Sequence, residues 1–427
     1  MLKKLFNLSG IFLIFILFII FSSYLLIDNN FFSLKDKLYS NFPNIELRKY
    51  VFNKKSKMEN FNNDYNEKFL PYTQFEKLDY IKKKIKFEKN LISQTNNLDK
   101  SISYKRYDTF FIDLFKDKLI LTDHLGNVYF IDQSKLFSKK EEQLFAKNIK
   151  SNLKVSRVFD AYVDEEKLFI SYSLNSDNCN TINVSYANIN FNTLQFKEFY
   201  NPKSCNETGS PGRIQFFIKD EEPGLLLSTS EGTHDKPGDS TQDKNSIFGK
   251  ILFLQLKDGK AQMLSLGHRV IQGLYADKNK IIATEHGPKG GDEINLIFDQ
   301  KNYGWPVVSL GERYDFKYGK EILSYKKNHL KNNFNEPIFS FIPSIGISEI
   351  IKLPESFSTY YDSHFLLSSL NGRSIYLIRF SDNFEKLVTI EKVFINNRIR
   401  DLKFITKNNS IILALEENRE IGILSKN

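Results

Sequence analysis

The chain has 427 residues, of which 41% are hydrophobic and 26% charged. This composition is typical of a globular protein and excludes an intrinsically disordered chain. The net charge of +9 comes from lysines scattered among acidic residues, without a basic stripe interleaved with aromatic residues. The charge therefore favours a solvated surface near a membrane, and we expect no nucleic-acid partner.

The N-terminal segment is hydrophobic. Lys3 and Lys4 precede a largely apolar run from Leu5 to Ile27, about the length of a membrane-spanning helix of ~20 residues. We expect residues 1–30 to form an uncleaved, single-pass anchor in the inner (cytoplasmic) membrane. The two lysines favour a cytoplasmic N-terminus, which places the rest of the chain in the periplasm or outside the cell. A cleaved signal peptide is the alternative, and it exports the same domain.

Residues 31–100 are polar and rich in lysine and asparagine, with few apolar runs. This pattern predicts a juxtamembrane linker that is only partly ordered. The pattern changes beyond residue 100, where short apolar strands begin to recur. We therefore expect residues 101–427 to form one β-domain.

A short apolar strand recurs six times in that domain. The copies are residues 118–122, 167–171, 224–228, 280–284, 364–368 and 410–414. In most copies a turn and a second strand follow, and no segment has the pattern of a long amphipathic helix. Such repeats are typical of propeller blades. The expected fold class is all-β, a six-bladed β-propeller preceded by one N-terminal transmembrane helix; an array of β-sandwiches is the alternative.

The two cysteines flank a predicted hairpin. Cys179 and Cys205 lie on either side of two strand-like runs, residues 181–189 and 194–199. A hairpin brings its two ends together, and an exported domain is in an oxidising space, so a disulfide is expected. Two free thiols are the alternative.

One family signature stands out in the second half of the chain. It reads Leu266-Gly-His-Arg-Val-Ile-Gln-Gly-Leu274, Ala283-Thr-Glu-His-Gly-Pro-Lys-Gly-Gly-Asp-Glu-Ile-Asn-Leu-Ile297 and Asn302-Tyr-Gly-Trp-Pro306. These segments resemble the PQQ-dependent glucose/sorbosone (aldose sugar) dehydrogenases, the soluble quinoproteins that are six-bladed propellers. The resemblance spans residues 108–425 and implies oxidation of an aldose or related alcohol with PQQ as cofactor.

The turn after Glu285 has the chemistry of a calcium site. Gly287 permits close backbone approach, so the turn can point carbonyl groups at a hard cation. The resemblance implies one calcium held by the backbone of Gly287 and Pro288 together with the cofactor. It implies a second, structural calcium at Glu293 and the carbonyl of Tyr303. For Glu293, a solvated charge at a turn is the alternative.

Three arginines suit an anionic cofactor. PQQ carries three carboxylates, and arginine binds carboxylates in a bidentate manner. The resemblance assigns this role to Arg269 in the Gly-His-Arg segment and to Arg398 and Arg400 in the Arg-x-Arg-Asp segment. Surface ion pairs are the alternative for each. His268, in contrast, is expected to be a hydrogen-bonded structural histidine.

The family's catalytic positions depart from the pattern. The family has a histidine base just before a Gly-Arg-Leu strand, but in this chain the base position falls at Gly209, ahead of Gly212-Arg-Ile214. A glycine accepts no proton, and loss of a positioned base costs about 10²–10⁴-fold in rate. Val270 and Asn371 also replace an amide and a lysine that the family directs at PQQ. His234, on a nearby loop, is a weak candidate for a substitute base.

Three functions therefore remain open. The first is PQQ- and calcium-dependent oxidation of a sugar or alcohol, with a quinone or cytochrome as electron acceptor. The second is a catalytically inactive propeller that binds a sugar, an envelope component or a protein partner. The third is a structural, calcium-bound domain of an envelope complex. The missing base separates the first from the second.

Overall fold

The computed structural model describes residues 78–88, 109–139, 142–176, 179–206, 211–231, 240–278, 280–313 and 325–426. All of them belong to one compact unit, Leu70–Asn427. Within these ranges the helices are short: α4 (Gln133–Leu136) and the 3-10 turns η1 (Leu330–Asn332), η2 (Thr359–Tyr361) and η3 (Thr406–Asn408). The prediction of an all-β fold is confirmed.

The described ranges contain no helix that is long and apolar enough to cross a membrane. The predicted anchor, residues 1–30, lies outside them.

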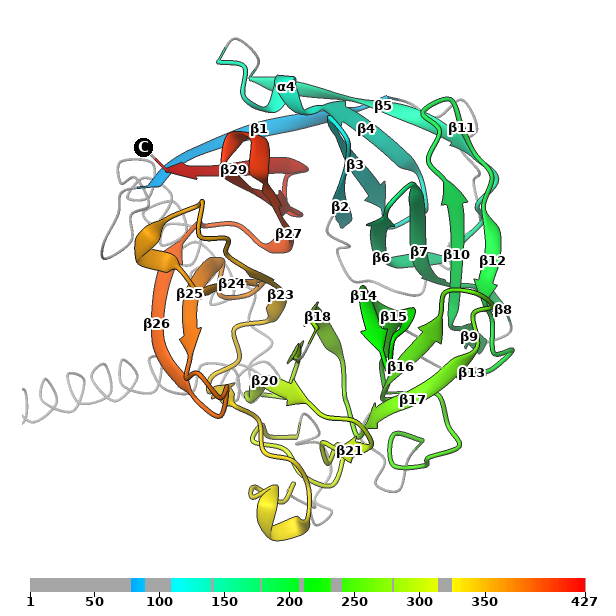
Figure 1. Ribbon diagram of the computed structural model, residues 1–427, viewed down its shortest axis with the longest axis vertical. Coiled ribbons are helices and arrows are strands. Elements are labelled where there is room, and N and C mark those ends of the chain that lie inside the picture. The colour runs from blue at the N-terminus through cyan, green and yellow to red at the C-terminus, as the bar shows by residue number, and fades with distance from the viewer. Residues whose placement is uncertain are drawn as a thin grey trace, which may run out of the picture. The chain divides into compact units, whose positions relative to one another are not determined.

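The strands form mostly antiparallel sheets that follow one another along the chain (Figure 1). The largest sheet joins β2 (Phe110–Phe115), β3 (Lys118–Asp123), β4 (Val128–Asp132) and β5 (Gln143–Ser151) through β1 (Leu78–Phe87) to β29 (Glu420–Lys426), β28 (Ser410–Leu415) and β27 (Ile399–Ile405), with β11 (Thr193–Leu194) beside β5. The next sheet holds β6 (Arg157–Asp164), β7 (Lys167–Ser173), β10 (Asn183–Asn188) and β12 (Lys197–Tyr200). A small sheet holds β8 (Asn175–Ser176), β9 (Cys179–Thr181) and β13 (Cys205–Asn206).

Three further sheets complete the described fold. One holds β14 (Pro211–Lys219), β15 (Glu222–Thr229), β16 (Lys250–Gln255), β17 (Ala261–Leu266) and β21 (Lys301–Asn302). Another holds β18 (Ile271–Ala276), β19 (Ile281–Glu285), β20 (Asp292–Ile297) and β22 (Phe339–Phe341). The last holds β23 (Ile347–Lys352), β24 (Phe365–Ser369), β25 (Ser374–Phe380) and β26 (Leu387–Phe394).

The first strand of each large repeat lies at the centre of the arrangement (Figure 1). These inner strands are β2, β6, β14, β18, β23 and β27. Each contacts the next around the circle, and β27 contacts β2, which closes a ring of inner strands. This propeller-like arrangement places side chains of distant segments side by side at the centre.

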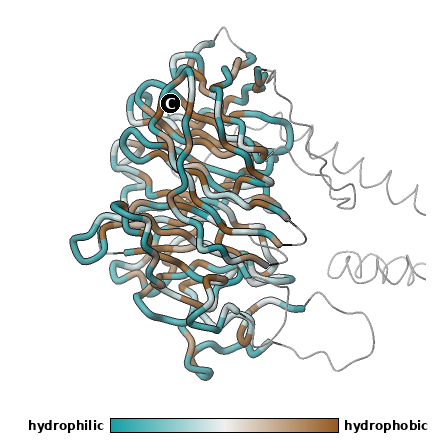
Figure 2. Tube along the Cα trace, turned by 90° about the vertical axis from the view of Figure 1, so that its right-hand side faces the viewer, coloured by the Kyte–Doolittle hydropathy of each residue, from teal (hydrophilic) through white to brown (hydrophobic). Residues whose placement is uncertain are grey.

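Apolar side chains fill the space between neighbouring sheets. The predicted apolar strands are the second strands of their sheets, such as β28, whose six residues are all buried. Figure 2 shows hydrophobic residues along the strands and hydrophilic residues in many connecting loops. A strand buried on both faces needs apolar residues at successive positions. The continuous apolar runs therefore allowed these strands to be predicted from the sequence.

Strand β1 lies within the segment predicted to be a partly ordered linker. It pairs antiparallel with β29, with Ile81 opposite Ile423, and parallel with β5, with Ile85 opposite Leu144. Its side chain at Leu78 is 1% exposed. The predicted domain start at residue 101 therefore omits a strand that bridges the beginning and the end of the β-domain.

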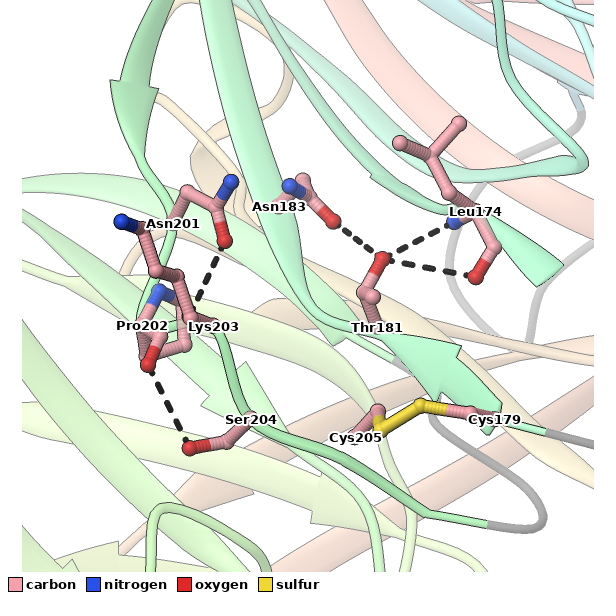
Figure 3. The surroundings of a disulfide bond; sticks show 9 residues. All are labelled: Leu174, Cys179, Thr181, Asn183, Asn201, Pro202, Lys203, Ser204 and Cys205. Atoms are coloured by element: carbon pink, nitrogen blue, oxygen red, sulfur yellow. Dashed lines mark hydrogen bonds between the residues drawn. A yellow bond between two sulfur atoms is a disulfide. The ribbon is translucent and has the colours of Figure 1, made fainter. Parts of the chain in front are cut away.

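Cys179 and Cys205 form a disulfide between β9 and β13, with their Cα atoms 5.3 Å apart (Figure 3). Thr181 lies beside this bridge. Its hydroxyl accepts a hydrogen bond from the Leu174 amide at 3.0 Å and donates one to Asn183 Oδ1. The bridge therefore fixes the small sheet just before the segment that carries Gly209.

A buried ionic network occupies the centre of the ring. The Arg213 side chain, on β14, is 4% exposed, and its Nη1 lies 2.9 Å from Asp160 Oδ1 on β6 and 3.2 Å from Glu349 Oε2 on β23. Asp401 Oδ1 on β27 is 3.6 Å from the same nitrogen, and Asp401 Oδ2 accepts the Ile112 amide of β2 at 2.9 Å.

Further contacts extend this network to the remaining inner strand. Arg213 Nε donates to the Gln272 carbonyl of β18 at 2.6 Å. Beside the arginine, Lys403 Nζ lies 3.2 Å from Asp113 Oδ2. Four carboxylates thus face two cations, and burial raises the pKa values of Asp113, Asp160 and Glu349. A fully buried charge is costly unless it is paired, so burial favours the protonated form of these carboxyl groups.

We predict that removing β1 destabilises the domain. A variant that starts at Leu70 should unfold at the same temperature as the full-length protein. A variant that starts at Thr109 should unfold several degrees lower, because β29 and β5 lose their shared partner and Leu78 and Ile85 leave the core. Circular dichroism during heating measures both. Equal unfolding temperatures for the two variants would contradict the role of β1.

We also predict that the network makes stability depend on pH through Glu349. Burial raises the pKa of Glu349 to about 7, while Arg213 opposes this shift. The folded state therefore binds this proton more tightly than the unfolded chain does. The resulting stability is fully present below pH ~4.5, the ordinary pKa of the group, and is lost as the pH rises through about 7.

The test compares unfolding temperatures from pH 5 to pH 8. Glu349→Gln should reduce the fall in unfolding temperature over this range, because about 1.4 kcal/mol per pKa unit is at stake. Glu355→Gln, at an exposed position, is the matched control and should keep the wild-type slope. An unchanged slope in Glu349→Gln would exclude this group as a source of the pH dependence.

Candidate functional site

A small cleft lies where β17 and β19 end and β20 begins, beside the segment after β21. Its lining residues are Gly267, Arg269, Glu285, His286, Gly287, Pro288, Glu293, Tyr303, Trp305, Val308 and Ser309. Five residues that the sequence singled out for the cofactor or calcium are among them: Arg269, Gly287, Pro288, Glu293 and Tyr303. The structure thus brings these predicted residues to one place, although they span 35 positions of the chain.

Arg269 is held at the cleft from two sides. Its Nη1 donates to the carbonyls of His286 at 3.2 Å and Gly287 at 3.0 Å. Its Nε lies 3.4 Å from Glu231 Oε1, and its guanidinium lies over the Trp305 ring at 5.2 Å. Glu231 also accepts the Trp305 indole N–H at 2.7 Å. The arginine is therefore oriented by a buried carboxylate and an aromatic face.

Glu285 fixes the backbone next to Arg269. Its carboxylate accepts the Arg269 amide, and its Oε2 lies 3.0 Å from His268 Nδ1. The other ring nitrogen of His268 lies 2.8 Å from Ser265 Oγ, and the His268 side chain is fully buried. His268 is therefore a hydrogen-bonded structural histidine, which confirms the expectation from the sequence.

His286 lines the cleft next to Gly287. Its Nε2 is buried and has no hydrogen-bond partner among the described residues. Burial lowers its pKa to about 4; Asp292 opposes this shift, whereas the positive charges of Arg269 and Arg400 reinforce it. The imidazole is therefore neutral at neutral pH. Arg398 and Arg400, unlike Arg269, are not among the residues that line this cleft.

Arg398 and Arg400 share one buried carboxylate. Arg398 Nε and Arg400 Nε each lie 2.8 Å from a different oxygen of Glu416, whose side chain is 0% exposed. Burial raises the pKa of Glu416, but Arg400 and Arg398 outweigh this effect and lower it overall. Arg400 Nη1 also donates to Gln272 Oε1 at 2.9 Å. Two guanidinium groups thus share one buried carboxylate.

The glycines of the turn after β19 are required by close packing. A Cβ added at Gly287 would lie 2.1 Å from the Gly291 carbonyl oxygen. Gly291 itself has φ +72° and sits against the Gly311 backbone. Asp292 holds the turn, because its Oδ2 accepts the amides of Ile345 and Ile347 at 3.0 Å. This carboxylate is therefore used within the protein.

Glu293 has the features of a cation ligand. It is 9% exposed, and burial, together with the charge of Glu285, raises its pKa to about 8. Asn295 Nδ2 lies 3.3 Å from Glu293 Oε2 and 3.5 Å from Glu285 Oε2, while the buried Asn295 Oδ1 has no hydrogen-bond partner in the described part of the chain. Two crowded carboxylates beside an unpartnered amide oxygen are a donor set that suits calcium.

No group of three histidine, cysteine or acidic side chains in the described ranges is arranged to hold a metal ion. A calcium ion at Glu293 would therefore need carbonyl oxygens as well. The predicted backbone ligands, Gly287, Pro288 and the carbonyl of Tyr303, line the same cleft as Glu293. The residues at the cleft fit a calcium ion if these backbone carbonyl oxygens complete its coordination.

The positions that depart from the family pattern fall in different places. Gly209 and His234 lie outside the described residues. Asn371 is exposed, next to the Gly346 turn. Val270 precedes β18, and its carbonyl accepts the His286 amide at 2.9 Å. Of the two described positions, Asn371 and Val270, neither lines the cleft.

The sequence did not reveal the carboxylates that orient the arginines. Glu231 follows β15 and Glu416 follows β28, so each glutamate comes just after an apolar strand. A charged residue directly after a buried strand indicates that its side chain has a buried partner. The sequence does not show which residue that partner is, because the pairing depends on how neighbouring sheets pack against each other.

Comparison with known proteins places the chain in a family. The model of the glucose / sorbosone dehydrogenase family matches residues 109–425. An uncharacterized protein of Synechocystis is 28% identical over 46% of this chain and 52% of its own length, so the match spans about half of that relative. The aldose sugar dehydrogenase YliI of Escherichia coli is 22% identical over 61% of this chain and 73% of its own length.

Solved structures show the same fold. A glucose dehydrogenase crystal structure has a TM-score of 0.63 at 18% identity and covers 74% of this chain and 96% of its own. The PQQ-bound aldose sugar dehydrogenase of Streptomyces coelicolor has a TM-score of 0.54 at 18% identity and covers 75% and 94%. Because the family model matches most of the chain, this protein belongs to the glucose/sorbosone dehydrogenase family.

Proposed function

We propose that this protein is a PQQ- and calcium-dependent dehydrogenase of an aldose or related alcohol, built on a six-bladed propeller. The observation that carries the proposal is the cleft itself, which brings Arg269 together with Gly287, Pro288, Glu293 and Tyr303, the residues that the resemblance assigns to the cofactor and to calcium. Membership of a sugar dehydrogenase family supports the reaction class. A fold alone does not fix a function, so the proposal depends on this site.

The charges of the site favour a polycarboxylate cofactor. Arg269, Arg398 and Arg400 would hold the carboxylates of PQQ, since guanidinium groups bind carboxylates in a bidentate manner. Bound PQQ supplies a quinone that accepts two electrons from the substrate. Glu231 and Glu416 keep the arginines in place when no anion is bound. His286 offers an unpartnered ring nitrogen to a ligand in the cleft.

Calcium would complete the same cleft. We place one ion at the carbonyls of Gly287 and Pro288, next to the cofactor, and a second at Glu293 and the carbonyl of Tyr303. The crowding of Glu293 and Glu285 supports the second site, because a cation would relieve the repulsion between the two carboxylates.

We assign no general base. The family's base position is Gly209 in this chain, and this substitution favours a second candidate function. In that alternative the propeller is catalytically inactive and binds a sugar, an envelope component or a protein partner. If the inactive propeller also binds no ligand other than calcium, it would be a structural domain.

We further propose a location for this activity. The apolar run within residues 1–30 supports a single-pass anchor in the inner membrane with the β-domain in the periplasm. A membrane location would bring the domain close to a quinone or cytochrome that takes up the electrons.

We predict that the full-length protein, purified in detergent with calcium, binds PQQ saturably when its absorbance is followed in a titration. Arg269→Gln should weaken this binding at least about tenfold, because a hydrogen bond to a charged group contributes roughly 1.5–3 kcal/mol. Arg379→Gln, at an exposed position on β25, is the matched control and should bind as the wild type does.

Sugar oxidation is measured next, with a panel of aldoses and an electron-accepting dye. Dye reduction that requires both sugar and PQQ would support the dehydrogenase. Binding of PQQ without turnover would support the inactive propeller. Failure of the wild type to bind PQQ would overturn the proposed cofactor.

We predict that calcium stabilises the protein through Glu293. Adding calcium at about 100 times its dissociation constant should stabilise the wild type by about 2.7 kcal/mol, which raises its unfolding temperature. Glu293→Gln should lose a large part of this increase, whereas Glu355→Gln should keep it. An equal calcium effect in all three proteins would show that Glu293 is not a ligand.

A further inference from the structure

We propose that Arg213, which does not line the cleft, is a positioning residue for Arg400 and therefore for cofactor binding. This inference rests on the proposed function. Arg213 belongs to the Gly-Arg-Ile segment that follows the empty base position at Gly209. Its guanidinium lies in the network at the centre of the ring, with three of its nitrogens directed at different inner strands.

Arg213 holds the backbone that carries Arg400. Its Nη2 donates to the Arg400 carbonyl at 2.8 Å, and its Nε donates to the Gln272 carbonyl at 2.6 Å. Gln272 Oε1 in turn accepts from Arg400 Nη1 at 2.9 Å. One guanidinium therefore fixes the main chain of both partners in a side-chain contact. The position of the Arg400 side chain therefore depends on Arg213 twice, because Arg213 holds the main chain of Arg400 and the main chain of its partner Gln272.

The sequence around Arg213 is fitted to this role. Gly212 precedes it, and a Cβ there would lie 2.2 Å from Ser228 Oγ. That hydroxyl accepts the Arg213 amide at 2.9 Å, and Ser171 Oγ donates to the Gly212 carbonyl at 2.8 Å. The main chain is thus held closely where the arginine turns toward the centre. Only glycine fits beside Ser228 without displacing it.

Lysine cannot replace Arg213 in this arrangement. A guanidinium has a planar fork with N–H groups in fixed directions, whereas an ammonium is a compact point charge. Lysine would keep the charge opposite Asp160 and Glu349, but it would not reach both the Gln272 and Arg400 carbonyls. The substitution therefore separates the positioning role from the need for a buried cation.

The test is a PQQ titration of the full-length protein in detergent with calcium. Arg213→Lys should raise the dissociation constant about tenfold, because Arg400 loses its fixed place. In an Arg400→Gln background the same substitution should add little, since coupled residues are not additive. Asp160→Asn is the matched control: it removes one charge from the network but keeps the contacts of Arg213 to the Arg400 and Gln272 carbonyls. Whatever its effect on the unfolding temperature, it should leave the dissociation constant within about twofold.

Equal losses of PQQ affinity in Arg213→Lys and Asp160→Asn would overturn the inference, because they would indicate general destabilisation. Wild-type affinity in Arg213→Lys would also overturn it, while leaving the proposed function intact. If Arg213→Lys does not fold, Gln272→Leu takes its place. This variant removes the side-chain end of the same link, so unchanged affinity would again contradict the inference. Failure of the wild type to bind PQQ removes the proposed function, and the inference with it.

Discussion

The buried guanidinium of Arg213 is the contact on which the centre of this protein depends. It meets β6, β18, β23 and β27 directly, and it reaches β2 through Asp401. A ring of inner strands leaves backbone and side-chain polar groups at its middle, and buried polar groups need partners. The planar guanidinium of Arg213 has several N–H donors, so it pairs with polar groups on inner strands of the other large sheets. The same network leaves more carboxylates than cations, which connects the stability of the ring to protonation.

The arginines of the candidate site are anchored in two different ways. Arg400 is anchored through Arg213 and Gln272, whereas Arg269 is anchored through Glu231 and Trp305. Arg269 donates to the Gly287 carbonyl, which is also the predicted calcium ligand. Cation and cofactor binding would therefore require Arg269 to exchange this carbonyl for an anionic partner. This exchange would couple calcium binding to cofactor binding.

The sequence predicted the part of the structure that depends on local pattern. The apolar runs predicted the second strands of the sheets. The Gly-rich turn after Glu285 predicted one wall of the cleft, because close backbone approach requires glycine there. The pairing of Arg398 and Arg400 with Glu416, and the role of Arg213, depend on residues far apart in the chain. Strand β1 was missed because its lysines gave it the composition of a linker, although its apolar residues Leu78 and Ile85 enter the core.

A crystal structure of the protein with PQQ and calcium bound tests the central claim most directly. The account predicts that PQQ lies in the cleft with its carboxylates on Arg269 and Arg400, and that Arg213 still donates to the Arg400 carbonyl. PQQ bound elsewhere, or bound in the cleft without contact to either arginine, would contradict the account.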